Sequence, residues 1–184
     1  MRGAVRRAGI TARRIGAAVL LLAGVGCTQT ERLALPNLRE ISPRLVTSGQ
    51  PSAAALAGLK EQGFGAVVYL APPTVGDAVR DEDAIVGRQG LVYVNLPIDF
   101  DAPTERDVDT FVRVLDALRD RKVLVHCQVN MRASSMVFLY RVTVLKEEPR
   151  VAYDAVTGVW VPHGPWRRLI ETTLERHGIR FELL

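Results

Sequence analysis

The stretch that decides the fold is Val123-Leu124-Val125-His126-Cys127-Gln128-Val129-Asn130-Met131-Arg132-Ala133-Ser134. An apolar run ends at His126-Cys127, and Arg132 follows Cys127 by five positions. Residues 134–142 contain no Gly or Pro and are mostly apolar, which predicts a buried helix. The stretch therefore predicts a buried strand, a short loop that begins with a cysteine, and a helix.

The predicted loop has the properties of an anion site that contains a nucleophile. Where a strand gives way to a helix, backbone N–H groups point into the loop and the positive end of the helix dipole lies beside them. This field attracts a phosphate-sized dianion and favours the thiolate form of Cys127. The guanidinium of Arg132 can donate to two oxygens of one phosphate. Cys127 and Arg132 are therefore candidate catalytic residues, and the alternative is that Cys127 is a small core residue.

Other residues of the stretch are candidates for binding the substrate. The loop residues would do so through their backbone: Gln128, Val129, Asn130 and Met131. None of them is Gly, although inward N–H groups usually require one residue at positive φ, and Asn130 adopts that region most readily of the four. His126 is expected to orient the loop through hydrogen bonds rather than to act as a base.

Residues 1–27 have the composition of an export signal. An Arg-rich segment up to Arg14 precedes an apolar run, residues 15–25, that is too short to span a membrane. The run ends in Gly24-Val25-Gly26-Cys27, which is close to the cleavage box of bacterial lipoproteins. We expect an exported protein, periplasmic or anchored to a membrane through a lipid on Cys27, with simple secretion as the alternative.

The formal charge of +4 belongs to this leader, which contains five arginines and no acidic residue. Residues 28–184 therefore carry a formal charge of −1, and we do not expect nucleic-acid binding. The chain has two cysteines, so a lipidated Cys27 leaves Cys127 without a disulfide partner. This favours a reactive, exposed thiolate that is sensitive to oxidation.

The remaining pattern predicts one α/β domain with a mainly parallel central sheet flanked by helices. Residues 28–37 are a predicted tether and residues 38–184 the domain. Strands are expected at 45–47, 64–70, 91–96 and 122–126, and helices at 52–62, 77–89, 104–119 and 165–176. Ligands of such sheets bind beyond the carboxyl ends of the strands, which is where Cys127 falls.

Residues 45–142 resemble the protein tyrosine phosphatase superfamily, in particular a bacterial branch related to dual-specificity phosphatases. The segments that carry the resemblance are Ser48-Gly49-Gln50-Pro51, residues 63–70, Tyr93-Val94-Asn95-Leu96-Pro97-Ile98 and the loop from Val125 to Arg132. The residues from Trp160-Val161-Pro162 onward resemble a C-terminal extension of the same superfamily. The resemblance implies a phosphorylated substrate, protein or small molecule. It also implies thiolate attack on phosphorus, a cysteinyl-phosphate intermediate and its hydrolysis by water, without a metal or other cofactor.

The resemblance further implies a general acid on a loop upstream of the cysteine. That segment is Asp99-Phe100-Asp101-Ala102-Pro103. The aromatic-acid-x-Pro order favours Asp101 as the acid, with Asp99 second, and loop aspartates without a role are the alternative.

The loop departs from the superfamily pattern, because its four residues between Cys127 and Arg132 are one fewer than usual. Ser134 does not directly follow Arg132, yet it lies where a longer loop would place the hydroxyl that helps to expel the thiolate; a helix-capping role is its alternative. The shorter length is also that of rhodanese-type sulfurtransferases, whose cysteine carries a persulfide. A sulfurtransferase that uses Cys127, or a phosphate-binding module without turnover, are thus the alternative functions.

Overall fold

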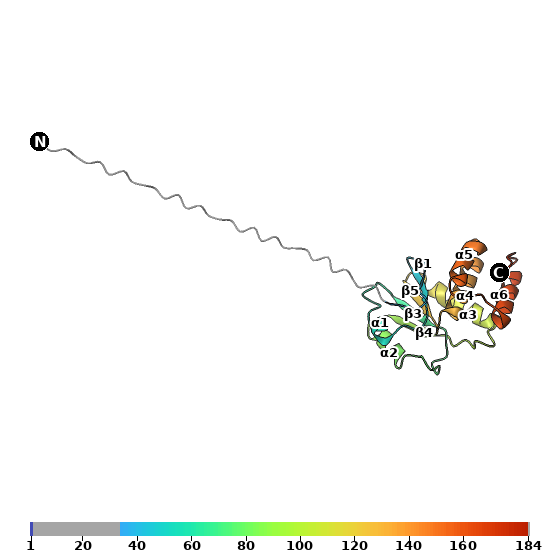
Figure 1. The fold of residues 1–184 in the computed structure, drawn as a ribbon, viewed down its shortest axis with the longest axis horizontal. Coiled ribbons are helices and arrows are strands. Elements are labelled where there is room, and N and C mark those ends of the chain that lie inside the picture. The colour runs from blue at the N-terminus through green and yellow to red at the C-terminus, as the bar shows by residue number, and fades with distance from the viewer. Residues whose placement is uncertain (2–33, 184) are drawn as a thin grey trace.

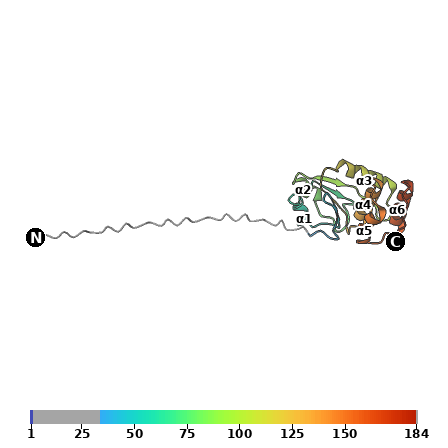
Figure 2. The same cartoon turned by 90° about the horizontal axis from the view of Figure 1, so that it is seen from above.

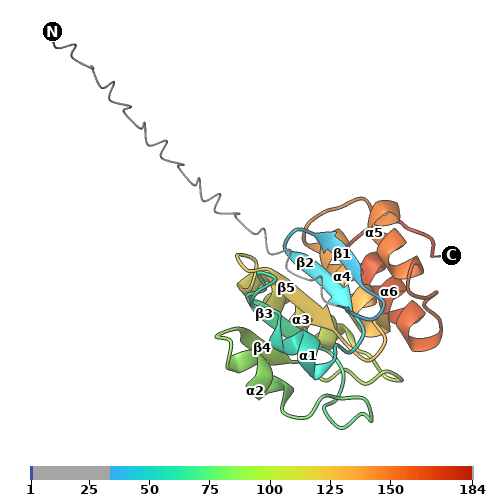
Figure 3. The ribbon, with the colours of Figure 1, turned by 60° about the vertical axis from the view of Figure 1, so that its left-hand side comes forward.

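The computed structural model describes Met1 and residues 34–183. The predicted export signal, the lipidation site Cys27 and the first part of the predicted tether lie outside the described residues. Five strands form one sheet in the order β1-β2-β5-β3-β4 (Figure 3). The strands are β1 (Arg39–Ser42), β2 (Leu45–Ser48), β3 (Ala66–Tyr69), β4 (Val92–Asn95) and β5 (Val123–His126).

Strand β5 occupies the centre of this sheet. It pairs in parallel with β2 on one side and β3 on the other, and β3 pairs in parallel with β4. All four residues of β5 are buried, as expected for an apolar strand that is covered on both faces. Of the described strands, only β1 runs antiparallel to its neighbour, at the edge beside β2. The carboxyl ends of β2, β3 and β5 therefore meet around Cys127.

Helices cover both faces of the sheet. They are α1 (Ala53–Ala57), α2 (Glu82–Gly87), α3 (Glu105–Ala117), α4 (Met131–Thr143), α5 (Pro149–Thr157) and α6 (Gly164–Arg176). Figures 1 and 2 place α1 and α2 on one side of the sheet and α3 to α6 on the other.

The alternation of side chains along a strand divides the core accordingly. Leu124 of β5 belongs to a smaller cluster with α1 and α2, whereas Val123 and Val125 belong to the larger cluster with α3 to α6.

The predicted α/β class is confirmed, and so is the buried helix, because α4 is buried from Arg132 to Thr143. Two elements were missed. The edge strand β1 is short, and three of its four residues are polar; α5 begins at Pro149 after Glu148, whose carboxylate accepts from Val151 N. The predicted helix 77–89 starts only at Glu82, because Asp81 adopts a left-handed conformation with φ 56° that a right-handed helix cannot contain.

Candidate active site

Cys127 directly follows β5 and is completely buried. Its N–H donates to Ser48 O of β2 at 3.3 Å, so the start of the loop continues the sheet pairing. The thiol is free, but the expected exposed thiolate is wrong for this conformation, since no surface of the residue reaches solvent. The tertiary packing of the larger core, to which Cys127 belongs, accounts for this difference.

Asn130 has the positive φ that the loop was expected to need, 74°, and is the residue before α4. Its side chain does not cap the helix; instead, Nδ2 donates to Asn37 O at 2.6 Å. Asn37 in turn donates from Nδ2 to Val129 O at 3.0 Å. The end of the predicted tether is therefore in contact with the loop.

The turn after β2 braces the loop from a second direction. Gln50 N donates to Gln128 O at 2.9 Å, and Gly49 and Val129 form an isolated bridge. A Cβ atom on Gly49 would lie 2.9 Å from Gln128 O, so only glycine permits this approach. The resemblance included this turn, but only the structure shows that it contacts the loop.

Arg132 is buried in the first turn of α4 and connects two segments. Its Nε donates to Ile98 O at 3.0 Å, and its Nη1 donates to Gln128 Oε1 at 3.4 Å. Its guanidinium carbon lies 5.0 Å from the centre of the Phe100 ring. A hollow of about 250 Å³ opens here, lined by Phe100, Gln128, Val129, Met131 and Arg132.

Asp99 and Asp101 are exposed on the segment that Arg132 contacts. Asp101 N donates to Asp99 Oδ1 at 2.9 Å, which forms a tight turn around Phe100. Trp166 Nε1 of α6 donates to Phe100 O at 2.9 Å, and the rings of Trp160 and Trp166 each lie 5.8 Å from the Phe100 ring. The two tryptophans, which belong to the larger core cluster, therefore also hold the acidic segment.

His126 takes part in a buried contact that sequence reasoning missed. Its Nε2 lies 2.7 Å from Glu82 Oε1, and its ring stacks on Tyr69 at 4.7 Å. Glu82 Oε2 accepts from Gln50 Nε2 at 2.9 Å. Burial, followed by the charges of Glu82 and Asp77, raises the pKa of Tyr69 to about 12, and the charge of Cys127 adds to the effect. Nothing in the local sequence distinguishes Glu82 from its acidic neighbours.

Ser134 does not cap α4, because Asn130 occupies the cap position. Its hydroxyl donates to Met131 O at 3.2 Å within the helix, and the residue is buried. Gln128, by contrast, extends across the loop: its Nε2 donates to Asp77 Oδ1 at 2.9 Å while its Oε1 accepts from Arg132.

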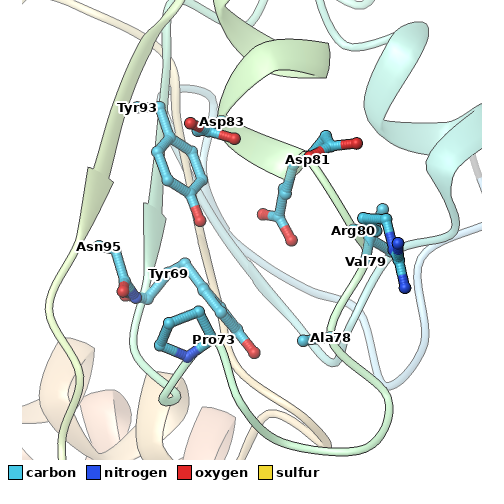
Figure 4. Close-up of a pocket in the computed structure, with 10 residues that line it drawn as sticks. Tyr69, Pro73, Ala78, Val79, Arg80, Asp81, Asp83, Tyr93 and Asn95 are labelled. Carbon is cyan, nitrogen blue, oxygen red and sulfur yellow. The ribbon is translucent and has the colours of Figure 1, made fainter.

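A second, larger cavity of about 550 Å³ lies beyond β3 and β4 (Figure 4). Tyr69, Tyr93 and Asn95 line it from the strands, and residues 78–83 line its other wall. Within the described part of the chain, no cluster of three or more His, Cys, Asp or Glu side chains could hold a metal ion. The described helices include none that is long and apolar enough to cross a membrane.

The sequence model of a family described as a DSP-PTPase phosphatase fused to NAD+ kinase matches residues 28–158. The match ends before Trp160 and α6. The beta-lactamase hydrolase-like proteins of Xylella fastidiosa strains 9a5c and Temecula1 are 30% and 29% identical to this chain over 146 residues. The match covers 77% of this chain and 32% of each relative, so the chain spans about a third of their length.

Solved structures show the same architecture. A DUF442 protein from Shewanella putrefaciens CN-32 has a TM-score of 0.72 and 28% identity, over 78% of this chain and 95% of that one. Tk-PTP, at 22% identity, has a TM-score of 0.65 over 77% of this chain and 98% of its own. TpbA of P. aeruginosa, also at 22% identity, has a TM-score of 0.60 over 79% and 92%. The last two show the fold alone.

Proposed function

The chain belongs to the family of DSP-PTPase phosphatases described as fused to NAD+ kinase, and on this basis we propose that it hydrolyses phosphate monoesters through Cys127. The observation that carries the proposal is the position of Arg132. It contacts Gln128 of the cysteine loop and the Ile98 carbonyl that precedes the acidic segment. The nucleophile loop and the segment that carries the candidate acids therefore meet at one guanidinium.

In the proposed first step, the Cys127 thiolate attacks phosphorus and the bond to the ester oxygen breaks. The leaving oxygen takes a proton from Asp101 or Asp99, and a cysteinyl phosphate remains. The terminal nitrogens of Arg132 and the loop N–H groups stabilise the charge on the phosphoryl oxygens. In the second step, water attacks phosphorus, the aspartate takes its proton, and phosphate and thiolate are released.

The buried thiol adds a condition to this mechanism. A substrate can reach Cys127 only if neighbouring side chains move, since the residue has no exposed surface. Gln128 is well placed for such a movement, because it is adjacent to Cys127 and half-buried. In the part of the chain that the structure describes, two hydrogen bonds, to Asp77 and Arg132, hold its side-chain amide.

Phosphotyrosine and phosphoserine peptides are proposed substrates, as are small phosphoesters outside the cytoplasm if the chain is exported. A substrate-trapping screen with Cys127→Ser separates these classes, because a variant without the nucleophile retains the phosphate-binding loop.

The decisive experiment measures phosphate release from p-nitrophenyl phosphate beside a thiosulfate-to-cyanide sulfur transfer assay. We expect activity in the first assay that Cys127→Ser abolishes and Arg132→Lys strongly reduces, because Lys lacks the planar pair of donors. Activity in the sulfur transfer assay alone would refute the proposed phosphatase function. Phosphate binding without either activity would favour a phosphate-binding module without turnover.

A further inference from the structure

A buried carboxylate contacts the last residue of β5, the strand that precedes Cys127. Glu82, the first residue of α2, is 4% exposed, and His126 is not exposed at all. The 2.7 Å contact between Glu82 Oε1 and His126 Nε2 joins residues that are 44 positions apart. The turn after β2 also contacts this pair through Gln50, whose Nε2 donates to Glu82 Oε2.

Stability alone gives a weak reason for this pair. Moving a carboxylate out of water costs free energy that its buried partners only partly return, and apolar residues often replace such pairs without loss. Leu124, two positions before His126 and on the same face of β5, belongs to the apolar cluster that packs against α1 and α2. A polar contact in such a place acts mainly through the geometry that it imposes.

We propose that Glu82 is a positioning residue for Cys127, which deepens the proposed function and rests on it. The carboxylate holds the His126 imidazole in one orientation, with Nε2 protonated, and so fixes the strand end from which the nucleophile emerges.

The hydrogen-bonding capacity of the two side chains supports this assignment. An ionised carboxylate only accepts, so the hydrogen between Glu82 and His126 resides on Nε2. The other ring nitrogen, Nδ1, is buried and has no hydrogen-bond partner among the described residues. Glu82 therefore makes the one side-chain hydrogen bond that sets the rotation of this ring.

The position of His126 on β5 explains how the ring can act on its neighbour. Successive side chains of a strand point to opposite faces, so His126 is held on the α2 side while Cys127 belongs to the core on the other side. The stack on Tyr69 holds the same ring from the adjacent strand β3. Pinning the imidazole thus restricts the backbone immediately before the nucleophile.

The larger cavity shows which neighbour can serve as a control. Glu82 and Asp83 both line it, and Figure 4 shows the Asp83 carboxylate beside the Tyr93 ring. Asp83, the second residue of α2, is exposed and carries the same charge, but among the described residues the carboxylate that pairs with His126 is that of Glu82. Asp83→Asn therefore removes one charge from this helix start without touching the imidazole.

The kinetic test compares Glu82→Leu, Glu82→Gln and Asp83→Asn in the full chain with p-nitrophenyl phosphate. Misplacing a reacting group reduces the rate of the chemical step more than it reduces the affinity for substrate. Glu82→Leu should therefore lower kcat on the order of 100-fold, with KM changed less than about threefold. Glu82→Gln keeps an acceptor oxygen, and a flipped Gln50 amide could accept from its new NH₂ group, so part of kcat should return. Asp83→Asn should stay within about twofold. Thermal melting of each variant identifies loss of folding.

A Glu82→Leu variant that melts cooperatively and keeps the kcat of Asp83→Asn would overturn the proposal. A second readout is independent of turnover: the nitrogen-15 spectrum of the imidazoles, of which the chain has three, with His126 assigned by His126→Asn. We expect a protonated Nε2 in the wild type and in Asp83→Asn, and a mixture of tautomers in Glu82→Leu. An unprotonated Nε2 in the wild type also refutes the proposal. A protonated Nε2 in a chain without phosphatase activity would refute the proposed function and leave the pairing of Glu82 with His126 standing.

Discussion

Asn130 shows how one residue can meet two demands of a short loop. Its left-handed backbone turns the chain from β5 into α4, and its amide donates to Asn37 O at 2.6 Å. The first property is local and follows from the residue type, which is why the sequence predicted it. The second depends on a residue 93 positions away, and no local pattern reveals such a contact.

We therefore expect Asn130→Ala to be less stable than Asn130→Gly. Both variants lose the hydrogen bond to Asn37, worth about 1 kcal/mol, but only Ala also carries the left-handed strain of about 1–2 kcal/mol. Urea denaturation measures both free energies of unfolding. Equal stabilities, or a more stable Ala variant, would show that the loop does not need the observed φ.

The two exposed aspartates of the acidic segment have different roles in the proposed reaction. Asp99 accepts from Asp101 N and thereby shapes the turn, whereas the Asp101 carboxylate accepts no hydrogen bond from the described residues. We expect Asp101→Ala to lower kcat on the order of 100-fold for alkyl phosphates and much less for p-nitrophenyl phosphate, whose leaving group needs no proton. Asp99→Ala should affect both substrates alike. The reverse pattern assigns the acid to Asp99.

The side chain of Gln128 offers a test of access to the buried thiol. Removing it in Gln128→Ala breaks the contacts to Asp77 and Arg132, so Cys127 should react several-fold faster with iodoacetamide. Val129→Ala is the matched control, because Val129 is an exposed neighbour on the same loop. Equal alkylation rates in the two variants would mean that other side chains exclude the reagent.

At the scale of elements, α6 acts on a segment far from it in the sequence. Trp166 Nε1 donates to Phe100 O across 66 positions, and the family match ends before this helix. The sequence predicted the helix from its composition, but not this contact. The ring contacts and the hydrogen bond together hold Phe100 against Arg132.

The two tryptophans form a matched pair for testing this support. Trp166→Phe keeps an aromatic ring but loses the hydrogen bond, so it should cost about 1 kcal/mol of unfolding free energy. It should also lower kcat for alkyl phosphates, because the acidic segment loosens. Trp160 Nε1 is buried and has no hydrogen-bond partner within residues 34–183, so Trp160→Phe should cost less. Chemical denaturation measures the free energy of unfolding of both variants, and kinetics measure their kcat. Equal losses in the two variants would contradict the role of the Trp166 hydrogen bond.

At the scale of the whole molecule, we propose that the leader exports the protein and that Cys27 carries a lipid. Cells that express the wild type with labelled palmitate should yield a labelled protein in the membrane fraction. Cys27→Ser should lose the label and leave that fraction, because lipid chains supply the membrane affinity. Cys127→Ser is the control and should keep the label. An unlabelled wild type would favour simple secretion.

The sequence by itself determined the α/β class, the family, the strand-loop-helix around Cys127 and the left-handed Asn130. These follow from periodicity, residue type and short spacings, which act over a few residues. Only the tertiary structure decided that Cys127 is buried, that Glu82 pairs with His126, and that Trp166 holds the acidic segment. Each of these depends on side chains that are distant in the chain and become neighbours only when the sheet and its helices pack. An isolated acidic or aromatic residue carries no local sign of such a partner.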